Sequence, residues 1–483
     1  MTYTPFVKVI KTDNNIYAYD VNSACILRIT PYIGEILENY AYYSGLGDSA
    51  DEIYQQVLEF IMKEQAKEEL FLPVERQVIQ PNVSPSDVTE DTLAPCSHLI
   101  LNVTEECNFG CNYCVYSGAY SGHRTHSQKT MTLDTAKKAV DLLAKNKDEI
   151  DERIILGFYG GEPLIRFEFI KNIVQYAKEC FGDHPCLFSI TTNGSLLTEE
   201  IIHFLIANNF AITISLDGPA EIHDRNRRLL DDSGSYQLVT DNISLLRNTA
   251  GERYFRDFVS FSCVITPPYD FQYLNDFFSG YDAMVRISTV DYNPDFYKND
   301  DLHMATGWEA LAANMKQYCL DGKQKKDFIS DGLSLPYDLF FRQLKKIHRI
   351  VRRQLTPGNN RAMGLCQPGL KRAFVSCDGD IYVCERTEGN TNMLIGSVSE
   401  GIRKDKVIRI LEDISYLDYS KCQSCWTRAF CNICFAHLSE NNEYSMEKWE
   451  FNCKNIRHNY EYMLRLYCEI MESDDTALDF LIN

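Results

Sequence analysis

The sequence predicts an α/β fold in which a parallel β-sheet wrapped by helices lies between two smaller parts. Three observations support it. Strand-like and helix-like segments alternate between residues 93 and about 300, three short strands followed by helices occupy the first ninety residues, and cysteines crowd the stretch from Cys366 to Cys453. A chain of 483 residues is too long for one ordinary core, so two or three domains are expected.

The N-terminal segment, residues 1–73, predicts strands over residues 6–10, 16–20 and 25–29, with Asp13, Asn14 and Asn15 in a tight turn between the first two. Helices are expected over residues 34–42 and 49–69. Five side chains of the second helix fall in helical register: Ile53, Val57, Phe60, Ile61 and Glu64. Residues 74–95 contain three prolines among Ser, Thr and Asp, which is typical of a linker.

Six strands are expected in the central segment, residues 96–300. They cover residues 99–103, 154–158, 187–191, 211–216, 258–265 and 285–290. Helices separate them. One helical face carries Phe169, Ile170, Ile173, Val174 and Ala177, and another helix, residues 198–208, begins with Glu199 and Glu200 in its first turn.

Directly after the first of these strands stand Cys107, Cys111 and Cys114, with three and then two residues between the thiols. This spacing can hold three corners of one 4Fe-4S cube and leaves the fourth iron open. An iron with a free site can bind and reduce a small molecule, which a four-thiolate structural site cannot do. A zinc knuckle, a cluster with a distant fourth cysteine, or chance are the alternatives.

The second strand leads into Gly160, Gly161, Glu162 and Pro163. A CxxxCxxC motif with an aromatic residue before its last cysteine, followed by this GGEP turn, resembles the radical S-adenosylmethionine (SAM) superfamily. The resemblance implies a partial (β/α)6 barrel with ligands at the C-terminal strand ends. It also implies that Cys107, Cys111 and Cys114 ligate a catalytic 4Fe-4S cluster, and that SAM binds the open iron and yields a 5'-deoxyadenosyl radical.

The same resemblance assigns the contacts of SAM. Tyr113 would lie near the adenine, and Gly160, Gly161 and Glu162 would receive the methionine ammonium. Two later strand ends place polar side chains beside a turn glycine, Thr192 and Asn193 in one and Ser215 and Asp217 in the other, although such residues also suit ordinary turns. Arg227 would either pair with the SAM carboxylate or form a salt bridge with Asp224.

The cysteines of residues 361–483 follow a helical bridge expected over residues 301–360. Their pattern resembles the SPASM domain, which carries auxiliary iron-sulfur clusters. It consists of Cys366, Gly379, Cys384, the pairs Cys422/Cys425 and Cys431/Cys434, and Cys453. Two residues separate Cys431 and Cys434 where that family commonly has three. By resemblance, one cluster takes Cys422, Cys425, Cys431 and Cys453, and the other takes Cys366, Cys384 and Cys434. Either Cys377 is the fourth ligand of the second set or that iron is open; a zinc ribbon is the competing interpretation.

Three strands and helices in the N-terminal order, together with residues 19–23, resemble the RiPP recognition element, a small winged-helix-like domain that binds the leader of a ribosomally made precursor peptide. In that family the leader pairs with an exposed edge strand. A structural cap on the barrel is the competing interpretation.

Taken together, these resemblances predict a radical SAM maturase of the sactipeptide or ranthipeptide type, which joins a cysteine sulfur to a carbon of another residue. SAM and three 4Fe-4S clusters are the expected cofactors, and an electron donor such as flavodoxin or ferredoxin is the expected partner besides the precursor peptide. Carbon-carbon crosslinking or side-chain oxidation, as in sulfatase maturation, is the closest alternative. A non-catalytic iron-sulfur or zinc scaffold that binds a peptide is a more distant one.

Composition excludes several other classes. A formal charge of -20 argues against a nucleic-acid or anionic-membrane surface. No apolar run approaches the roughly 20 residues of a membrane span, and the first residues lack the basic and apolar regions of a signal peptide. We expect a cytoplasmic protein, in which the 18 cysteines serve as metal ligands or free thiols.

Overall fold

The computed structural model describes residues 3–46, 49, 51–74, 79–80, 86, 88, 96–120, 122–145, 147–150, 153–290, 306–322, 331–353, 360–361, 368–434, 439–440 and 442–481. Its centre is a ten-stranded sheet with the strand order β10-β9-β8-β7-β6-β5-β12-β13-β14-β15. The seven strands from β10 to β12 run parallel, and the last three are antiparallel.

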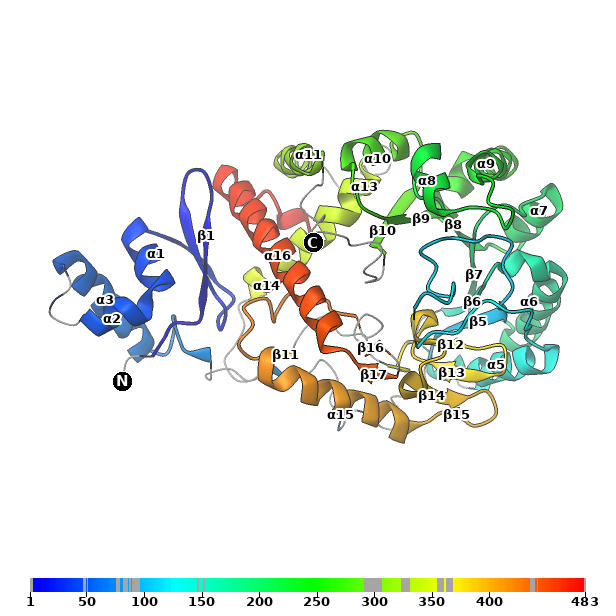
Figure 1. Ribbon diagram of the computed structural model, residues 1–483, viewed down its shortest axis with the longest axis horizontal. Helices are drawn as coiled ribbons and strands as arrows, with labels where there is room; N and C mark the ends of the chain where they lie inside the picture. Colours follow the sequence, from blue (N-terminus) through cyan, green and yellow to red (C-terminus); the bar gives the residue numbers. More distant parts are fainter. Residues whose placement is uncertain are drawn as a thin grey trace.

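All six predicted strands of the central segment are confirmed. They are β5 (His98–Thr104), β6 (Ile154–Gly160), β7 (Cys186–Thr192), β8 (Ala211–Ser215), β9 (Val259–Ile265) and β10 (Met284–Thr289). The helices of this part are α5 (Leu133–Lys145), α6 (Phe167–Phe181), α7 (Glu199–Ala207), α8 (Ala220–Asn226), α9 (Tyr236–Phe258) and α10 (Phe271–Phe278), with short 3-10 turns η4 (Lys147–Glu149) and η5 (Pro163–Arg166). The sheet curves into a partial barrel, and helices cover its outer face (Figure 1).

The two faces of the barrel strands differ in chemistry. Along β9, Phe261 and Cys263 are buried toward the helices, whereas Ser260 and Ser262 alternate with them and are half-buried on the inner face. The apolar face predicted for α6 is confirmed, because all five of its side chains are buried. The outer face therefore forms the core, and small polar side chains leave space inside the barrel.

The N-terminal part is a three-stranded antiparallel sheet of β1 (Val7–Lys11), β2 (Ile16–Asp20) and β3 (Ile26–Ile29), with α1 (Pro31–Glu38), α2 (Tyr40–Leu46) and α3 (Glu52–Ala66). The three predicted strands are confirmed, but the single helix expected over residues 34–42 is wrong. Asn39 divides it into two, because its side-chain amide donates to Glu35 O at 3.1 Å and competes with helix continuation. In α3, Ile61 and Glu64 are buried, whereas Ile53 and Phe60 are exposed.

Between the barrel and the cysteine-rich region lie α11 (Trp308–Leu320), α13 (Ser334–Pro336), the π-helical turn η7 (Tyr337–Phe341) and α14 (Arg342–Arg353), as expected of a helical bridge. Most of the predicted linker lies outside the described residues. Within it, β4 (Ile79–Gln80) pairs in parallel with β11 (Asn360–Arg361).

The C-terminal region begins with β12 (Arg372–Val375), which extends the barrel sheet beside β5. β13 (Asp380–Tyr382), η8 (Glu385–Thr387), η9 (Thr391–Met393), β14 (Leu394–Ser397), β15 (Gly401–Ile402) and α15 (Lys404–Lys421) follow, then β16 (Ser439–Glu440), β17 (Glu443–Tyr444), α16 (Met446–Ser473) and η11 (Asp479–Leu481). The long helix α16 reaches from the cysteine-rich region to β1 (Figure 1). In the described part of the chain, no helix has both the length and the apolar character needed to cross a membrane.

Candidate active site

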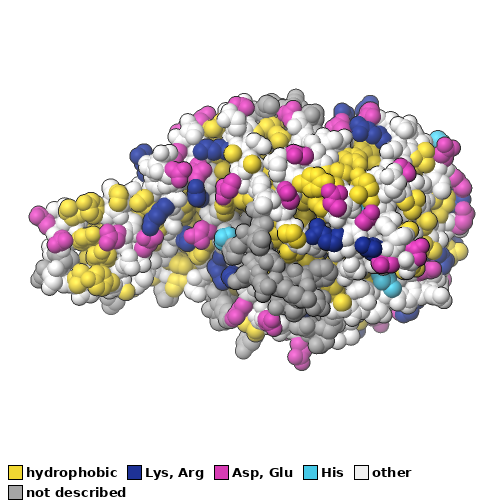
Figure 2. Space-filling view, turned by 45° about the horizontal axis from the view of Figure 1, so that its top comes forward, with side chains coloured by type: hydrophobic (Ala, Val, Ile, Leu, Met, Phe, Trp, Pro, Cys, Tyr) yellow, Lys and Arg dark blue, Asp and Glu magenta, His cyan; other side chains and the backbone are white. Residues whose placement is uncertain are grey.

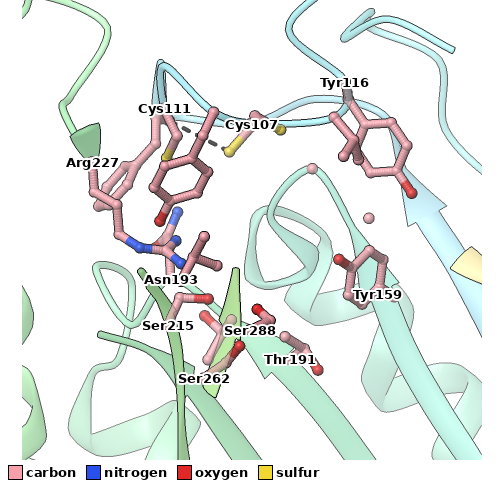
Figure 3. A pocket seen from close by; sticks show the side chains of 18 of the residues that line it. Cys107, Cys111, Tyr116, Tyr159, Thr191, Asn193, Ser215, Arg227, Ser262 and Ser288 are labelled. Atoms are coloured by element: carbon pink, nitrogen blue, oxygen red, sulfur yellow. Dashed lines mark hydrogen bonds between the residues drawn. The ribbon is translucent and has the colours of Figure 1, made fainter. Parts of the chain in front are cut away.

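A pocket lies at the C-terminal ends of the barrel strands (Figure 3). Its floor carries hydroxyl groups from four successive strands, those of Thr191, Ser215, Ser262 and Ser288. The loop after β5 covers it from the opposite side. The other lining residues are Cys107, Phe109, Cys111, Tyr113, Cys114, Val115, Tyr116, His126, Tyr159, Gly160, Gly161, Thr192, Asn193, Arg227, Val264, Thr289, Val290 and Arg386.

The structure brings Cys107, Cys111 and Cys114 to this one pocket. The loop that carries them is held from outside by backbone hydrogen bonds, for example from Gly110 N to Arg228 O at 2.8 Å. Burial raises the pKa of the Cys107 thiol to about 12 and that of Cys111 to about 11. Metal ligation by these thiols therefore needs a positive centre that favours the thiolate.

The donor set fits an iron-sulfur cluster. Within the described residues, no three His, Cys, Asp or Glu side chains converge closely enough to hold a single metal ion. A cube presents a separate iron atom to each thiolate, so it suits sulfur atoms that are spread along one wall of a pocket. Cys107, Cys111 and Cys114 are the residues that would hold it.

Two glycines pack the end of β6 against the beginning of the cysteine loop. Gly161 N donates to Thr104 O at 2.8 Å. A Cβ atom would lie 2.4 Å from Thr104 O at position 160, and 2.2 Å from Glu106 O at position 161. Only glycine allows this close approach of two backbones. Both glycines also line the pocket, where a ligand can reach their backbone.

Glu162, which we expected to contact SAM, lies behind the pocket wall. Its carboxylate is fully buried and accepts hydrogen bonds from Leu164 N at 3.0 Å, Thr192 Oγ1 at 2.8 Å and Asn193 N at 2.7 Å. Burial outweighs these hydrogen bonds and raises the pKa of Glu162 to about 7. In this structure the carboxylate ties the GGEP turn to the end of β7.

Asn193 faces the pocket and belongs to a closed ring of three polar side chains. Its Nδ2 donates to Asn108 Oδ1 at 2.8 Å, Asn108 Nδ2 donates to Ser195 Oγ at 2.9 Å, and Ser195 Oγ donates to Asn193 Oδ1 at 2.6 Å. Asn108 lies between the first two cysteines of the motif. The ring therefore fixes the cysteine loop relative to the end of β7.

Arg227 pairs with Asp217. Its Nε donates to Asp217 Oδ2 at 3.0 Å, the Tyr113 hydroxyl donates to the same oxygen, and Val264 N donates to Oδ1 at 2.9 Å. Arg227 and Tyr113 line the pocket, whereas Asp217 lies behind them. The alternative salt bridge of Arg227 with Asp224 is wrong, because Asp224 Oδ1 instead accepts from the backbone N of residues 235 and 236.

Several pocket residues were not identified from the sequence. Ser262 and Ser288 could have been found, because polar residues alternate with apolar residues along both strands. His126 has no such signal: its Nδ1 donates to Glu105 O at 3.0 Å, which leaves Nε2 facing Cys114 Sγ at 3.4 Å. Arg386 arrives from the C-terminal region, two residues after Cys384.

Four of the predicted auxiliary ligands lie together. Cys425 N donates to Cys422 O at 3.0 Å, and Cys422, Cys431 and Cys453 pack around Trp449. Burial raises the pKa of Cys431 to about 11, and the nearby thiols of Cys453 and Cys425 contribute in the same direction. This is the set assigned to one cluster.

The second set is only partly described. Cys366 lies outside the described residues, whereas Cys384 and Cys434 are half-buried. Cys377 is buried, and its thiol donates to Asn102 O at 3.1 Å. Cys377 lies in the turn that joins β12 to β13, whereas Cys384 follows the end of β13. The two thiols therefore belong to opposite ends of β13.

Comparisons with known proteins agree with the barrel and its motif. Residues 101–277 match the family described as the Radical SAM superfamily. The cysteine-type anaerobic sulfatase-maturating enzyme of Clostridium novyi is 32% identical over 152 residues, which cover 31% of this chain and 40% of that protein. The radical SAM cyclopropyl synthase TigE of Paramaledivibacter caminithermalis is 26% identical over 216 residues, 42% of this chain and 43% of that protein. The central segment is therefore a radical SAM domain.

Among solved structures, native anSMEcpe with bound AdoMet superposes with a TM-score of 0.55 at 18% identity, covering 78% of this chain and 99% of that one. This likeness confirms the α/β fold with its parallel sheet. The chain spans about two fifths of the length of the curated relatives it matches. The matched segments thus concern the radical SAM domain and not the whole chain.

Proposed function

We propose that this chain is a radical SAM enzyme that joins a cysteine sulfur to a carbon of another residue in a ribosomally made precursor peptide. The observation that carries the proposal is the pocket itself. Three half-buried cysteines, a hydroxyl-lined floor and Arg386 from the cysteine-rich region face one space. A 4Fe-4S cluster on Cys107, Cys111 and Cys114, together with SAM, supplies the removal of a hydrogen atom from an unactivated carbon.

The residues of the chain position the reactants. Arg227, held by Asp217, offers its remaining N–H groups to an anionic group such as a carboxylate. The hydroxyls of Ser215, Ser262 and Ser288 can donate to or accept from a ribose or a peptide backbone. Such positioning decides which carbon reacts, because a carbon held elsewhere does not reach the reacting centre.

Peptide binding is assigned to the N-terminal part. Its edge strand β1 faces α16, where Lys8 pairs with Glu461 at 2.7 Å. At the other edge, β3 pairs only with β2 among the described strands. An extended leader can add to this edge through backbone hydrogen bonds.

The surface of this part supports the same assignment. Apolar side chains gather over the projecting N-terminal end of the molecule (Figure 2). Tyr32, Tyr42 and Phe60 are 46%, 65% and 42% exposed there. Exposed aromatic groups of this kind mark interaction surfaces. They favour a leader-binding domain over a structural cap.

The position of Cys377 favours thioether formation over electron transfer alone. It lies in the turn before β13, whereas Cys384 lies beyond the other end of that strand, and its thiol donates to Asn102 O at 3.1 Å, so we propose that it does not complete the set of Cys366, Cys384 and Cys434. That set then keeps one iron available for a substrate thiol. In the net reaction the 5'-deoxyadenosyl radical would take one hydrogen atom from the carbon, the thiol would release a proton to solvent, and formation of the carbon–sulfur bond would release one electron. An auxiliary cluster would accept that electron.

The test starts from chain purified without oxygen and reconstituted with iron and sulfide. It is incubated with SAM, dithionite and the cysteine-containing precursor peptide encoded beside its gene. We expect the peptide to lose two hydrogens per crosslink and its cysteine to resist alkylation. A Cys114→Ala variant should cleave no SAM, whereas Cys186→Ala, which removes an exposed thiol outside the pocket, should be active.

The alternatives give different results. A peptide that loses mass while its cysteine is still alkylated indicates carbon-carbon coupling or side-chain oxidation, and contradicts thioether formation. Absence of SAM cleavage in the reconstituted, reduced chain indicates a non-catalytic scaffold.

A further inference from the structure

The loop between Cys425 and Cys431 also packs against the N-terminal part. Three alternate side chains of this loop reach across to it. Lys8 Nζ lies 5.4 Å from the ring centre of Trp426, and the rings of Phe430 and Tyr19 are 5.2 Å apart. The third side chain is Arg428. A loop that carries two predicted cluster ligands therefore contacts the domain to which we assign leader binding.

Arg428 makes the most specific of these contacts. Its Nη2 donates to Asn22 Oδ1 at 2.9 Å, and its guanidinium carbon lies 4.8 Å from the ring centre of Phe6. Asn22 is itself held by the N-terminal part, since its Nδ2 donates to Leu72 O at 2.9 Å. On the other side, Arg428 Nη1 donates to Gln423 O, which lies between Cys422 and Cys425, at 2.7 Å. The guanidinium thus joins the two parts directly.

This guanidinium is buried without a carboxylate partner among the described residues. Arg428 is 3% exposed, and its Nε has no hydrogen-bond partner among the described residues. The buried carboxylate of Asp20 acts on it through space, but that carboxylate accepts hydrogen bonds from Ser23 N and Phe71 N and forms no salt bridge with Arg428 in the described part of the chain. A buried charge of this kind is destabilising unless an opposite charge lies nearby. Four thiolates around an iron-sulfur cube give a net negative charge, and Cys425 is three residues away.

A second cation contacts the same loop. Lys346 Nζ on α14 donates to Phe430 O at 2.8 Å and to Cys431 O at 3.4 Å. Two cations beside one short loop suit an anionic group held by its cysteines.

We propose that Arg428 is a positioning residue that holds the N-terminal part against the loop of residues 426–430. This contact forms fully only when Cys422, Cys425, Cys431 and Cys453 hold their cluster. The proposal rests on the auxiliary cluster of the proposed function. Its consequence is an order of assembly: the leader-binding domain takes its place only on a chain that already carries this cluster.

The test measures docking of the N-terminal part on the full chain, reconstituted without oxygen. A carbodiimide joins Lys8 to Glu461 while the two groups are 2.7 Å apart, and mass spectrometry counts the link. The link between Lys129 and Asp378, 2.8 Å apart and away from this interface, serves as the internal reference. Iron content and the midpoint potential of the auxiliary cluster are measured on the same samples.

We expect Cys431→Ser, and wild-type chain stripped of iron by a chelator, to lose roughly fivefold or more of the Lys8–Glu461 link relative to the reference link. Arg428→Ala should lose the link while keeping its iron, and its auxiliary cluster should have a lower midpoint potential because a buried positive charge is gone. Arg428→Lys should restore part of both. Arg253→Ala, at a 91% exposed arginine on α9, should change neither.

Two results would overturn the proposal. One is an unchanged Lys8–Glu461 link in stripped wild-type chain or in Cys431→Ser chain with reduced iron, which leaves the proposed function intact. The other is a wild-type iron content sufficient for the radical SAM cluster alone, which removes the auxiliary cluster from the proposed function as well. An unchanged midpoint potential in Arg428→Ala would also contradict the charge argument.

Discussion

Arg124 and Glu388 form an ion pair in which both side chains are more than nine-tenths buried. Arg124 belongs to the loop that follows the three cysteines, and Glu388 belongs to the C-terminal region. Asn102 Nδ2 on β5 donates to both carboxylate oxygens of Glu388, at 2.8 and 3.0 Å. The guanidinium lies 3.7 Å from the ring centre of Tyr116, which lines the pocket. The C-terminal region therefore supports one wall of the candidate active site.

Replacing Glu388 by Ala should leave the Arg124 guanidinium buried and unpaired. We expect the free energy of unfolding to fall by about 3–5 kcal/mol, the usual cost of breaking a buried pair from one side. Urea unfolding of the chain kept without oxygen measures it. The matched control is Glu400→Ala, at an exposed carboxylate of the same region. Equal stability of the two variants would contradict a structural role for the pair.

Glu162 should make stability depend on pH. Its pKa in the folded chain is about 7 and its ordinary value is 4.5, because burial disfavours the carboxylate. The folded chain then binds this proton more tightly than the unfolded chain, so stability from this group is fully present below pH 4.5 and is lost as the pH rises to about 7. The loss is roughly 3 kcal/mol.

Unfolding free energies of wild type and Glu162→Gln, measured from pH 4.5 to 8, test this. The variant has no proton to lose, so wild type should lose roughly 3 kcal/mol of stability relative to the variant as the pH rises through this range. A constant difference across this range would show that Glu162 does not titrate there.

Removing Arg227 should weaken SAM binding. The substitution Arg227→Ala takes away pocket N–H donors and leaves Asp217 buried with less compensation. A lost charge-assisted hydrogen bond costs about 1.5–3 kcal/mol, so we expect the Kd for SAM to rise by roughly 10- to 150-fold. Equilibrium dialysis of SAM against reconstituted chain measures it. Arg225→Ala, at an exposed neighbour, should bind SAM normally, and an unaltered Kd in Arg227→Ala would refute the assignment.

Gly161→Ala should prevent assembly of the radical SAM cluster. The added Cβ would lie 2.2 Å from Glu106 O and would push the cysteine loop away from β6. Iron content and the visible absorbance of the reconstituted chain report the loss. Gly45→Ala is the matched control, because nothing lies within 4 Å of its Cβ position. Full iron incorporation in Gly161→Ala would show that the loop can adjust.

The barrel could be predicted because its strands carry a local signal. Val259, Phe261 and Cys263 alternate with Ser260 and Ser262. The motif from Cys107 to Cys114, together with the GGEP turn after the next strand, indicates the chemistry of the site. The orientation of Glu162 could not be predicted, since a carboxylate after a glycine pair looks the same whether it faces a ligand or the protein. Nor could Glu388, which meets Arg124 across 264 residues of chain.

The sheet that runs from β5 into β12 also limits how the chain can be divided. Four residues of β12, from Arg372 to Val375, pair with His98 to Leu101 of β5. A chain shortened before residue 361 would expose the backbone edge of an apolar strand, which invites pairing between molecules. Such a fragment should aggregate. The barrel and the cysteine-rich region thus share one continuous sheet, so neither can be exchanged as a separate module without cutting that sheet.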